Sequence, residues 1–311
     1  MKKIALFGLA NAGKTSCLKV LRREFDVIAN LEPTLGVERG EVQFFGRKLL
    51  VADFGGQMAY RERYLKSPEL HFAGNSHLYY VVDVQDPGAL KPAVAYFREV
   101  VRLTRQHSPG ARFVLLFHKS DPGFSPKPGE TDVKSEFWNA AEEVLAAGGE
   151  GERHFAYITS IHQPLTVVTA FTQPLFEDDE LPAAVSRALE AFCKENGFSL
   201  AVLFSEYHAV GAYRDEELAP PELDEALVRH LGELDLELAK FNEEGTAFAD
   251  QLLLSAPFEL KFGPRVLTFH VTVAAKRPVD VVATKALVRS LAGELQKIFE
   301  NVNLAQFLAE G

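Results

Sequence analysis

The stretch GLANAGKT, from Gly8 to Thr15, follows the short apolar run IALF and constrains the fold more than any other part of the chain. It fits the pattern G-x-x-x-x-G-K-[ST], in which a strand leads through a glycine-containing loop into a helix. The two glycines let the backbone bend so that successive N–H groups point toward a phosphate. Lys14 adds a positive charge for the outer phosphates, and the Thr15 hydroxyl suits Mg²⁺. We therefore expect a nucleotide phosphate site, against the alternative of a strand-to-helix turn that matches by chance.

Residues 1–177 alternate short apolar runs with helical stretches, which is typical of an α/β fold with a mostly parallel sheet covered by helices. Six strands are predicted, at KIALFG, EVQFFG, KLLVADF, HLYYVVDV, RFVLLFH and HFAYITS. The second and third are joined by a tight hairpin, so one edge of the sheet should be antiparallel. Helices are predicted over residues 14–25, 89–106, 133–147 and 165–176, and the Pro- and Gly-rich residues 120–132 predict a loop.

The acidic stretch EDDELP predicts a boundary between a first domain, residues 1–177, and a smaller α+β domain, residues 178–311. The predicted order beyond it is a helix, a hairpin of two strands, a long helix, two or three strands and a final long helix. In VLTFHVTVAA, alternate residues from Leu267 to Val273 should share one face. Two apolar stripes mark the long helices: Leu223, Leu227, Leu231, Leu234 and Leu238, then Leu287, Leu291, Leu295, Ile298 and Val302. No cluster here has catalytic or metal-ligand spacing, so this domain is expected to be a binding module.

Length and composition narrow the class of protein. The chain has 311 residues, longer than one typical domain, and only two cysteines, Cys17 and Cys193, which favours a reducing compartment over a disulfide framework. No apolar run approaches the roughly 20 residues that span a bilayer. MKKIALFG enters a strand at once, and neither a signal peptide nor a lipidation motif is found. We therefore expect a cytoplasmic protein with no direct membrane anchor, recruited to membranes only through partners.

The net charge of −10 is unevenly distributed. Residues 178–311 carry 12 basic and 23 acidic side chains, whereas residues 1–177 are close to neutral. Because an acidic surface repels a phosphate backbone, we expect no nucleic-acid partner.

The stretch LLVADFGGQ places a carboxylate, Asp53, at the end of a strand, followed by Gly56 and Gln57. A carboxylate opposite the phosphate loop suits Mg²⁺, held directly or through water. Gly56 permits close backbone approach to a γ-phosphate, and the Gln57 amide can orient an attacking water. These residues alone would also fit an ordinary strand end with a glycine turn.

Asp121, in FHKSD after the strand RFVLL, is the residue that indicates the base. Guanine presents two neighbouring donors that one carboxylate can accept, whereas adenine places a lone pair at one of these positions, so such a site can discriminate strongly. The aliphatic stem of Lys119 would lie along the base. The backbone N–H groups of Ser160 and Ile161, in YITSI, would meet the base carbonyl oxygen.

Residues 1–177 therefore resemble the small GTPases of the Ras superfamily. GLANAGKT, PTLG and DFGGQ resemble the Arf-like branch, whereas HKSD, in place of the commoner NKxD, and TSI resemble the Rag/Gtr branch. A second domain after the first also fits Rag/Gtr proteins, whose C-terminal part is a roadblock/longin-like module used for dimerisation. The resemblance implies a P-loop G domain over residues 1–177 and a roadblock/longin-like dimerisation domain over residues 178–311.

The resemblance also implies roles for single residues in a switch that binds GTP or GDP with Mg²⁺. Thr34, in EPTLG, would lie in switch I and bind the metal together with Thr15 and Asp53 when a γ-phosphate is present. Switch II would comprise Gly56, Gln57 and the following MAYRERY. Gln57, Thr34 and Lys14 would take part in hydrolysis.

His118 departs from the usual Asn, whose amide ties the base to the phosphate loop, although an imidazole N–H can do part of that work. The nucleotide contacts implied by the whole resemblance are Gly8, Asn11, Ala12, Gly13, Lys14, Thr15, Ser16, Gly56, His118, Lys119, Asp121, Ser160 and Ile161.

The leading hypothesis is a GTP-binding switch with slow intrinsic hydrolysis that forms a homo- or heterodimer through its second domain. Its partners would include exchange proteins and GTPase-activating proteins, because no arginine finger can be assigned in cis and a supplied one accelerates hydrolysis by roughly 10³- to 10⁵-fold. One alternative is a guanine-nucleotide-binding scaffold with negligible turnover, which the presence of Gln57 and Thr34 disfavours. Another is a P-loop ATPase or small-molecule kinase, which HKSD and TSI disfavour.

Overall fold

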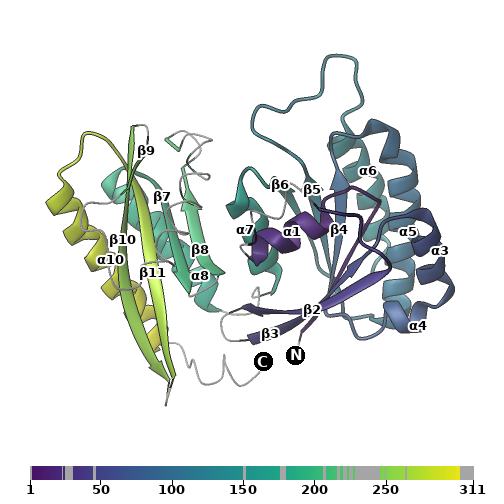
Figure 1. Ribbon diagram of the computed structural model, residues 1–311, viewed down its shortest axis with the longest axis horizontal. Coiled ribbons are helices and arrows are strands. Elements are labelled where there is room, and N and C mark those ends of the chain that lie inside the picture. The colour runs from purple at the N-terminus through teal and green to yellow at the C-terminus, as the bar shows by residue number, and fades with distance from the viewer. Residues whose placement is uncertain are drawn as a thin grey trace. The chain divides into compact units, whose positions relative to one another are not determined.

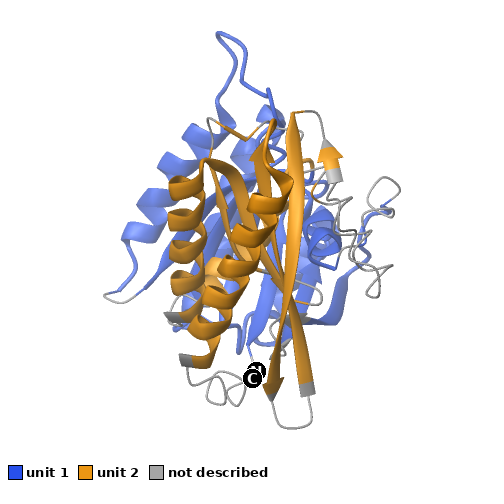
Figure 2. Cartoon of the chain, turned by 90° about the vertical axis from the view of Figure 1, so that its left-hand side faces the viewer, with its two compact units in different colours: residues 1–161, 311 blue, residues 162–310 orange. Residues whose placement is uncertain are grey.

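A computed structural model of the chain describes residues 2–301 apart from residues 23, 25–30, 45–46, 150–151, 176–179, 206–207, 216–217, 249 and 263–264, and apart from the stretch 220–245, in which only Leu223 and Leu227 are described. The chain forms two compact units that divide between Ile161 and His162 (Figure 2).

The first unit is built on a six-stranded sheet in the order β2-β3-β1-β4-β5-β6. Its strands are β1 (Lys3–Gly8), β2 (Val37–Phe44), β3 (Arg47–Phe54), β4 (His77–Asp83), β5 (Arg112–His118) and β6 (His154–Thr159). All neighbouring pairs are parallel except β2 and β3, which form an antiparallel hairpin at the edge. Both the six strands and the antiparallel edge confirm the sequence prediction.

Helices cover both faces of this sheet. They are α1 (Lys14–Leu21), α3 (Met58–Lys66), α4 (Pro68–His71), the short 3₁₀ turn η1 (Pro87–Ala89), α5 (Leu90–His107) and α6 (Val133–Ala146). Figure 1 shows α1 on one side of the sheet and α3, α5 and α6 on the other. Because parallel strands all end at the same edge, the loops after β1, β3, β4, β5 and β6 open together there.

An aromatic core lies between the sheet and the helices α3, α5 and α6. The ring of Phe7 on β1 stacks on Phe54 of β3 with centroids 4.2 Å apart, and Phe54 meets the edge of Tyr64 on α3 at 5.0 Å. Tyr80 on β4 packs against Phe97 of α5, also at 5.0 Å. This core fixes the strand ends from which the site is built.

The helices α3 and α4 were not predicted as helices. The stretch MAYRERYLK buries only Tyr64, so its sequence carries no apolar stripe. Of the predicted helix over residues 14–25, α1 ends at Leu21, and residues 23 and 25 lie outside the described residues. The other three predicted helices of residues 1–177 agree within one or two residues.

The second unit contains a five-stranded antiparallel sheet in the order β8-β7-β11-β10-β9. Its described elements are α7 (Pro164–Leu175), α8 (Glu180–Asn196), β7 (Phe198–Ser205), β8 (His208–Arg214), β9 (Thr246–Phe248), β10 (Gln251–Phe262), β11 (Arg265–Lys276) and α10 (Val281–Asn301). The predicted hairpin is β7–β8, and the later strands are β9 to β11. Figure 2 shows α8 and α10 side by side against this sheet.

The two faces of the second sheet are covered by different elements. A Cβ at Gly211 of β8 would lie 2.8 Å from Val185, which places α8 on that face. Side chains of the opposite face, such as Leu200 and Val202, form a cluster with Leu223 and Leu227 against which α7 packs. The two compact units divide between residues 161 and 162, so α7 lies in the second unit, and the expected domain boundary after residue 177 stays a prediction.

The apolar stripe of the last helix differs from the expected one. Leu291 and Leu295 are fully buried as predicted, but Leu287 is 39% exposed. Ile298 is half-buried. The buried side is completed instead by Val288 and Phe299. In the other predicted stripe, Leu223 and Leu227 are buried. The remaining predicted positions lie outside the described residues: Leu231, Leu234 and Leu238 of that stripe, and Val302 of the last helix. Among the described helices, none is both long and apolar enough to cross a bilayer.

Candidate nucleotide-binding site

The phosphate loop joins β1 to α1 and presents an open helix N-terminus. Gly13, the residue before α1, has a φ of 94° and caps the helix with no side chain. A Cβ at this position would lie 2.3 Å from the His118 ring, so only glycine fits without displacement. The first N–H groups of α1 thus have no side-chain cap, which is a favourable arrangement for an anion.

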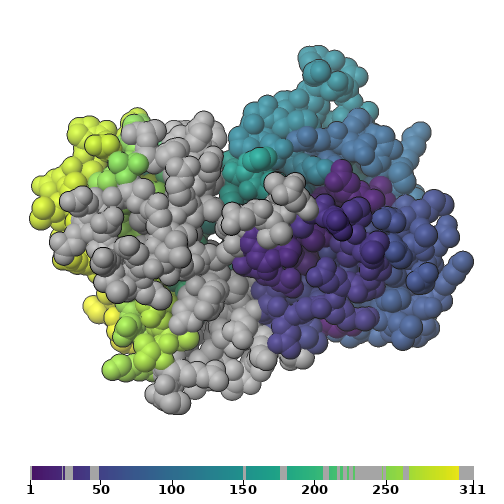
Figure 3. Space-filling view, viewed as in Figure 1, coloured from purple at the N-terminus to yellow at the C-terminus, as the bar shows by residue number. Residues whose placement is uncertain are grey.

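A cavity of about 310 Å³ opens at this loop. In the space-filling view, the purple N-terminal part of the chain reaches the surface of the first unit (Figure 3). The cavity is lined by Ala10, Asn11, Gly13, Lys14, Thr15, Ser16, Leu31, Glu32, Pro33, Thr34, Gly56 and Gln57. It therefore brings together eight of the predicted site residues, from the phosphate loop and from both predicted switches.

The three predicted metal ligands converge on one point. The Thr15 hydroxyl lies 2.6 Å from Oδ2 of Asp53 and 2.8 Å from the Thr34 hydroxyl, which is itself 3.2 Å from the same carboxylate oxygen. Oδ1 of Asp53 is buried and has no hydrogen-bond partner in the part of the chain that the structure describes. Hard oxygen donors around an unpaired buried carboxylate oxygen fit Mg²⁺.

Burial controls the ionisation of the two charged groups at this point. It raises the pKa of Asp53, although the Thr15 hydroxyl and Lys14 counteract it. Burial also lowers the pKa of Lys14 from 10.5 to about 8. The Lys14 ammonium donates to the backbone oxygens of Leu9 at 2.7 Å and Gly8 at 3.3 Å, which holds it beneath the loop.

The predicted switch II begins in direct contact with the phosphate loop. A Cβ at Gly56 would lie 2.2 Å from the backbone carbon of Leu9, so the two backbones touch. Gln57 follows as the N-cap of α3 with its side chain exposed and not used for capping. Its amide is thus available at the mouth of the cavity.

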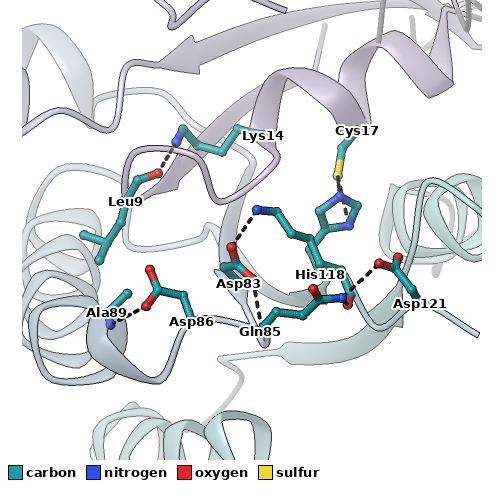
Figure 4. A network of polar contacts seen from close by, with 10 residues as sticks. Leu9, Lys14, Cys17, Asp83, Gln85, Asp86, Ala89, His118 and Asp121 are labelled. Carbon is teal, nitrogen blue, oxygen red and sulfur yellow. Dashed lines mark hydrogen bonds and ion pairs between the residues drawn. The ribbon is translucent and has the colours of Figure 1, made fainter. Parts of the chain in front are cut away.

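The predicted base-recognition residues meet at the ends of β5 and β6, and Figure 4 shows His118 and Asp121 among them. The Ser160 hydroxyl donates to Oδ1 of Asp121 at 2.6 Å. Lys119 has a φ of 62° and its ammonium pairs with Asp83 at 2.6 Å. Ile161 follows Ser160 directly, and a contact of its N–H with a base stays a prediction.

His118 connects this base region to the phosphate loop. Its Nδ1 lies 2.9 Å from the Thr159 hydroxyl, its ring approaches Gly13, and its nitrogens lie 3.7 and 3.8 Å from the Cys17 sulfur. Burial lowers the pKa of His118 to about 4, so the ring is neutral at physiological pH. The imidazole thus connects the phosphate loop to the end of β6.

Sequence reasoning missed two polar residues of this region, namely Gln85, which donates to Asp121, and Asp83, which pairs with Lys119. Both lie at the end of β4, next to β5 in the sheet, in the stretch DVQD. The sequence signal that could have revealed this region is Asp83, a carboxylate at the end of a strand, like Asp53 at the end of β3. Of the other predicted residues, Gly8 ends β1 and Ala12 lies in the phosphate loop itself.

The fold and the site together define a small GTPase of the Ras superfamily. A family model described as the Gtr1/RagA G protein conserved region matches residues 3–217. The chain belongs to this Gtr1/RagA family.

Similar proteins agree with this placement. GTP-binding protein GTR1 of Saccharomyces cerevisiae is 30% identical over 124 residues, which are 39% of this chain and 40% of that protein. ADP-ribosylation factor 1 of Brassica rapa is 30% identical over 156 residues, 48% of this chain and 81% of that protein. The solved structure of the Arl6 BBS3 small GTPase of Trypanosoma brucei with the bound nucleotide analogue GppNp aligns with 55% of this chain and 92% of that chain, at 15% identity and a TM-score of 0.43.

Proposed function

We propose that this chain is a molecular switch that binds GDP and GTP with Mg²⁺ and slowly hydrolyses GTP. The observation that carries the proposal is the convergence of Thr15, Thr34 and Asp53, because it joins the phosphate loop to switch I through one prospective metal position. Thr34 reaches this point from a separate segment, so its place there can depend on the nucleotide.

Thr15, Thr34 and the unpaired Oδ1 side of Asp53 would hold Mg²⁺. When bound, the metal would neutralise developing charge on the β- and γ-phosphates. Lys14 would also bind the negatively charged phosphates. Burial lowers the pKa of Lys14, but a nearby phosphate would counteract this effect and keep the ammonium protonated.

Gln57 is the residue that we assign to hydrolysis. Its exposed amide at the start of α3 can accept from and donate to a water beside the γ-phosphate. Positioning is the main contribution a protein makes to phosphoryl transfer, and no arginine is assigned to the reaction in this chain. We therefore expect slow intrinsic GTP hydrolysis that an activating protein accelerates.

Gln57→Leu tests this role. The variant keeps the size of the side chain but cannot orient water, so we expect GTP turnover to fall at least tenfold while GDP affinity stays within about threefold. The nucleotide released on denaturing the purified protein should be identified first, and single-turnover hydrolysis then followed for both proteins. Equal GTP turnover in the two proteins would show that Gln57 has no role in hydrolysis.

The same measurements test the alternative functions. Bound guanine nucleotide with no turnover in either protein, even with partners added, would favour a guanine-nucleotide-binding scaffold. Bound adenine nucleotide would refute the guanine site.

The second unit is proposed to be a roadblock/longin-like module that mediates homo- or heterodimerisation. Its antiparallel sheet, with α8 and α10 side by side on one face, is compatible with such a module. Exchange and GTPase-activating proteins would act at the switches of the first unit.

A further inference from the structure

The loop that follows β4 supports the proposed base-recognition loop from behind. Asp83, the last residue of β4, is paired in register with His118, the last residue of β5. One residue later, the Val84 N–H donates to the His118 carbonyl at 3.1 Å. Strand pairing therefore continues to the point where the base-recognition residues begin.

Gln85 then bonds to this neighbouring loop at two places. Its side-chain amide donates to the backbone oxygen of Lys119 at 2.7 Å and to Oδ2 of Asp121 at 2.9 Å (Figure 4). Its own backbone N–H donates to Oδ1 of Asp83 at 2.9 Å, while Oδ2 of Asp83 pairs with the Lys119 ammonium. Gln85 is thus fixed by the same carboxylate that holds Lys119.

Asp121 consequently lies between two donors, one on each carboxylate oxygen. Ser160 donates to Oδ1 and Gln85 to Oδ2. A carboxylate oxygen has about two acceptor sites, so each oxygen keeps one for a further donor. Two adjacent free acceptor sites in a fixed plane match a base edge that presents two adjacent donors, as guanine does.

We propose that Gln85 is a positioning residue that sets guanine selectivity by orienting the Asp121 carboxylate. The inference rests on the proposed function and adds a residue from a third strand end to the base site. Without Gln85, Oδ2 loses its restraint and the carboxylate can rotate about the bond to its Cβ. Both hydrogen bonds to the base then weaken, and the bond to the 2-amino group contributes less.

The test compares Gln85→Ala with a matched control, Gln106→Ala, in the full chain. Gln106 is exposed near the C-terminal end of α5, at the opposite edge of the sheet from the site. Dissociation constants are measured for GDP, for inosine diphosphate, which lacks the 2-amino group, and for ADP. For Gln85→Ala we expect GDP affinity to fall three- to tenfold and the preference for GDP over inosine diphosphate to shrink by a similar factor, with ADP weak throughout. Gln106→Ala should match the wild type.

The ratio of the affinities for GDP and inosine diphosphate distinguishes a positioning role from a general disturbance of the site. A disturbed phosphate loop would weaken the binding of all three nucleotides equally and leave this ratio unchanged. An unchanged ratio, or tighter GDP binding showing that Gln85 competes with the base, would overturn the inference. Gln85→Glu is a second test, because the glutamate carboxylate cannot donate a hydrogen bond and repels Asp121. This variant should lose at least as much GDP affinity as Gln85→Ala. If it binds GDP as tightly as the wild type, the inference is also overturned. Failure of the wild type to bind GDP would instead refute the proposed function.

Discussion

At the scale of single residues, His118 contributes to the site through its shape and its lack of charge. Its ring lies against Gly13 on one side and reaches Thr159 on the other, which joins the phosphate loop to the strand ends around Asp121. Because the ring is buried, a proton on it would be costly. The native packing between Gly13 and Thr159 therefore depends on the neutral imidazole.

This dependence predicts how stability changes with pH. The folded pKa of about 4 lies below the ordinary value of 6.5, so the unfolded chain binds more protons between these two values. His118 therefore contributes roughly 3 kcal/mol to the free energy of unfolding above pH 6.5, and this contribution is lost as the pH falls toward 4. In His118→Asn this part of the pH dependence should disappear, which urea unfolding from pH 4.5 to 8 would measure. His154→Asn, at an exposed position on β6, is the control. Parallel curves for wild type and His118→Asn would contradict the assignment.

Motifs predicted the site residues that act through their own chemistry, such as Lys14 and Asp53. They did not reveal Gln85, because a glutamine after a strand has no distinctive pattern. Its role arises only from the adjacency of β4 and β5, which brings residues 36 positions apart in sequence into contact with each other.

At the scale of elements, the contact between Gly56 and the phosphate loop places the start of α3. Gly56→Ala adds a Cβ that would overlap the Leu9 backbone, so the start of switch II must move away and carry Gln57 with it. Small misplacements of a positioning group can cost about 10²-fold in rate, so we expect GTP hydrolysis to fall at least tenfold while GDP binding changes less than threefold. Single-turnover hydrolysis and GDP titration would measure this.

Gly110→Ala is the matched control for that change. Gly110 precedes β5 and has open space around its Cβ position, so the substitution should alter neither quantity. A Gly56→Ala variant that hydrolyses GTP at the wild-type rate would show that the contact between switch II and the loop has no part in turnover.

Strands were predicted better than helices in both units. The strands carry continuous or alternating apolar runs, as in HLYYVVD, where all but the last residue are buried. By contrast, α3 buries only Tyr64, and the stripe of α10 is displaced because Leu287 faces outward while Val288 is buried. Helices whose apolar residues are few, or whose small residues share the buried side, give no clear period in the sequence.

At the scale of the whole molecule, the position of α7 decides how the chain can be divided. Leu165 and Val168 of α7 pack against the cluster formed by Leu200 and Val202, so a fragment of residues 162–311 keeps this cover and a fragment of residues 178–311 lacks it. Loss of two apolar contacts of this size costs about 2 kcal/mol or more. We therefore expect the longer fragment to unfold cooperatively at higher urea, and equal midpoints would show that α7 does not belong to this unit.

The same pair of fragments tests whether the second unit mediates dimerisation. Residues 162–311 contain no part of the phosphate loop, so association of this fragment would be independent of nucleotide. We expect this fragment to sediment as a dimer with or without GDP, or to form a heterodimer with the equivalent fragment of a related chain, because the proposed interface lies within the second unit. Monomeric behaviour of the fragment, combined with dimerisation of the full chain that changes with GTP, would move the interface to the switches. The role of the second unit would then be to support the first unit rather than to pair it.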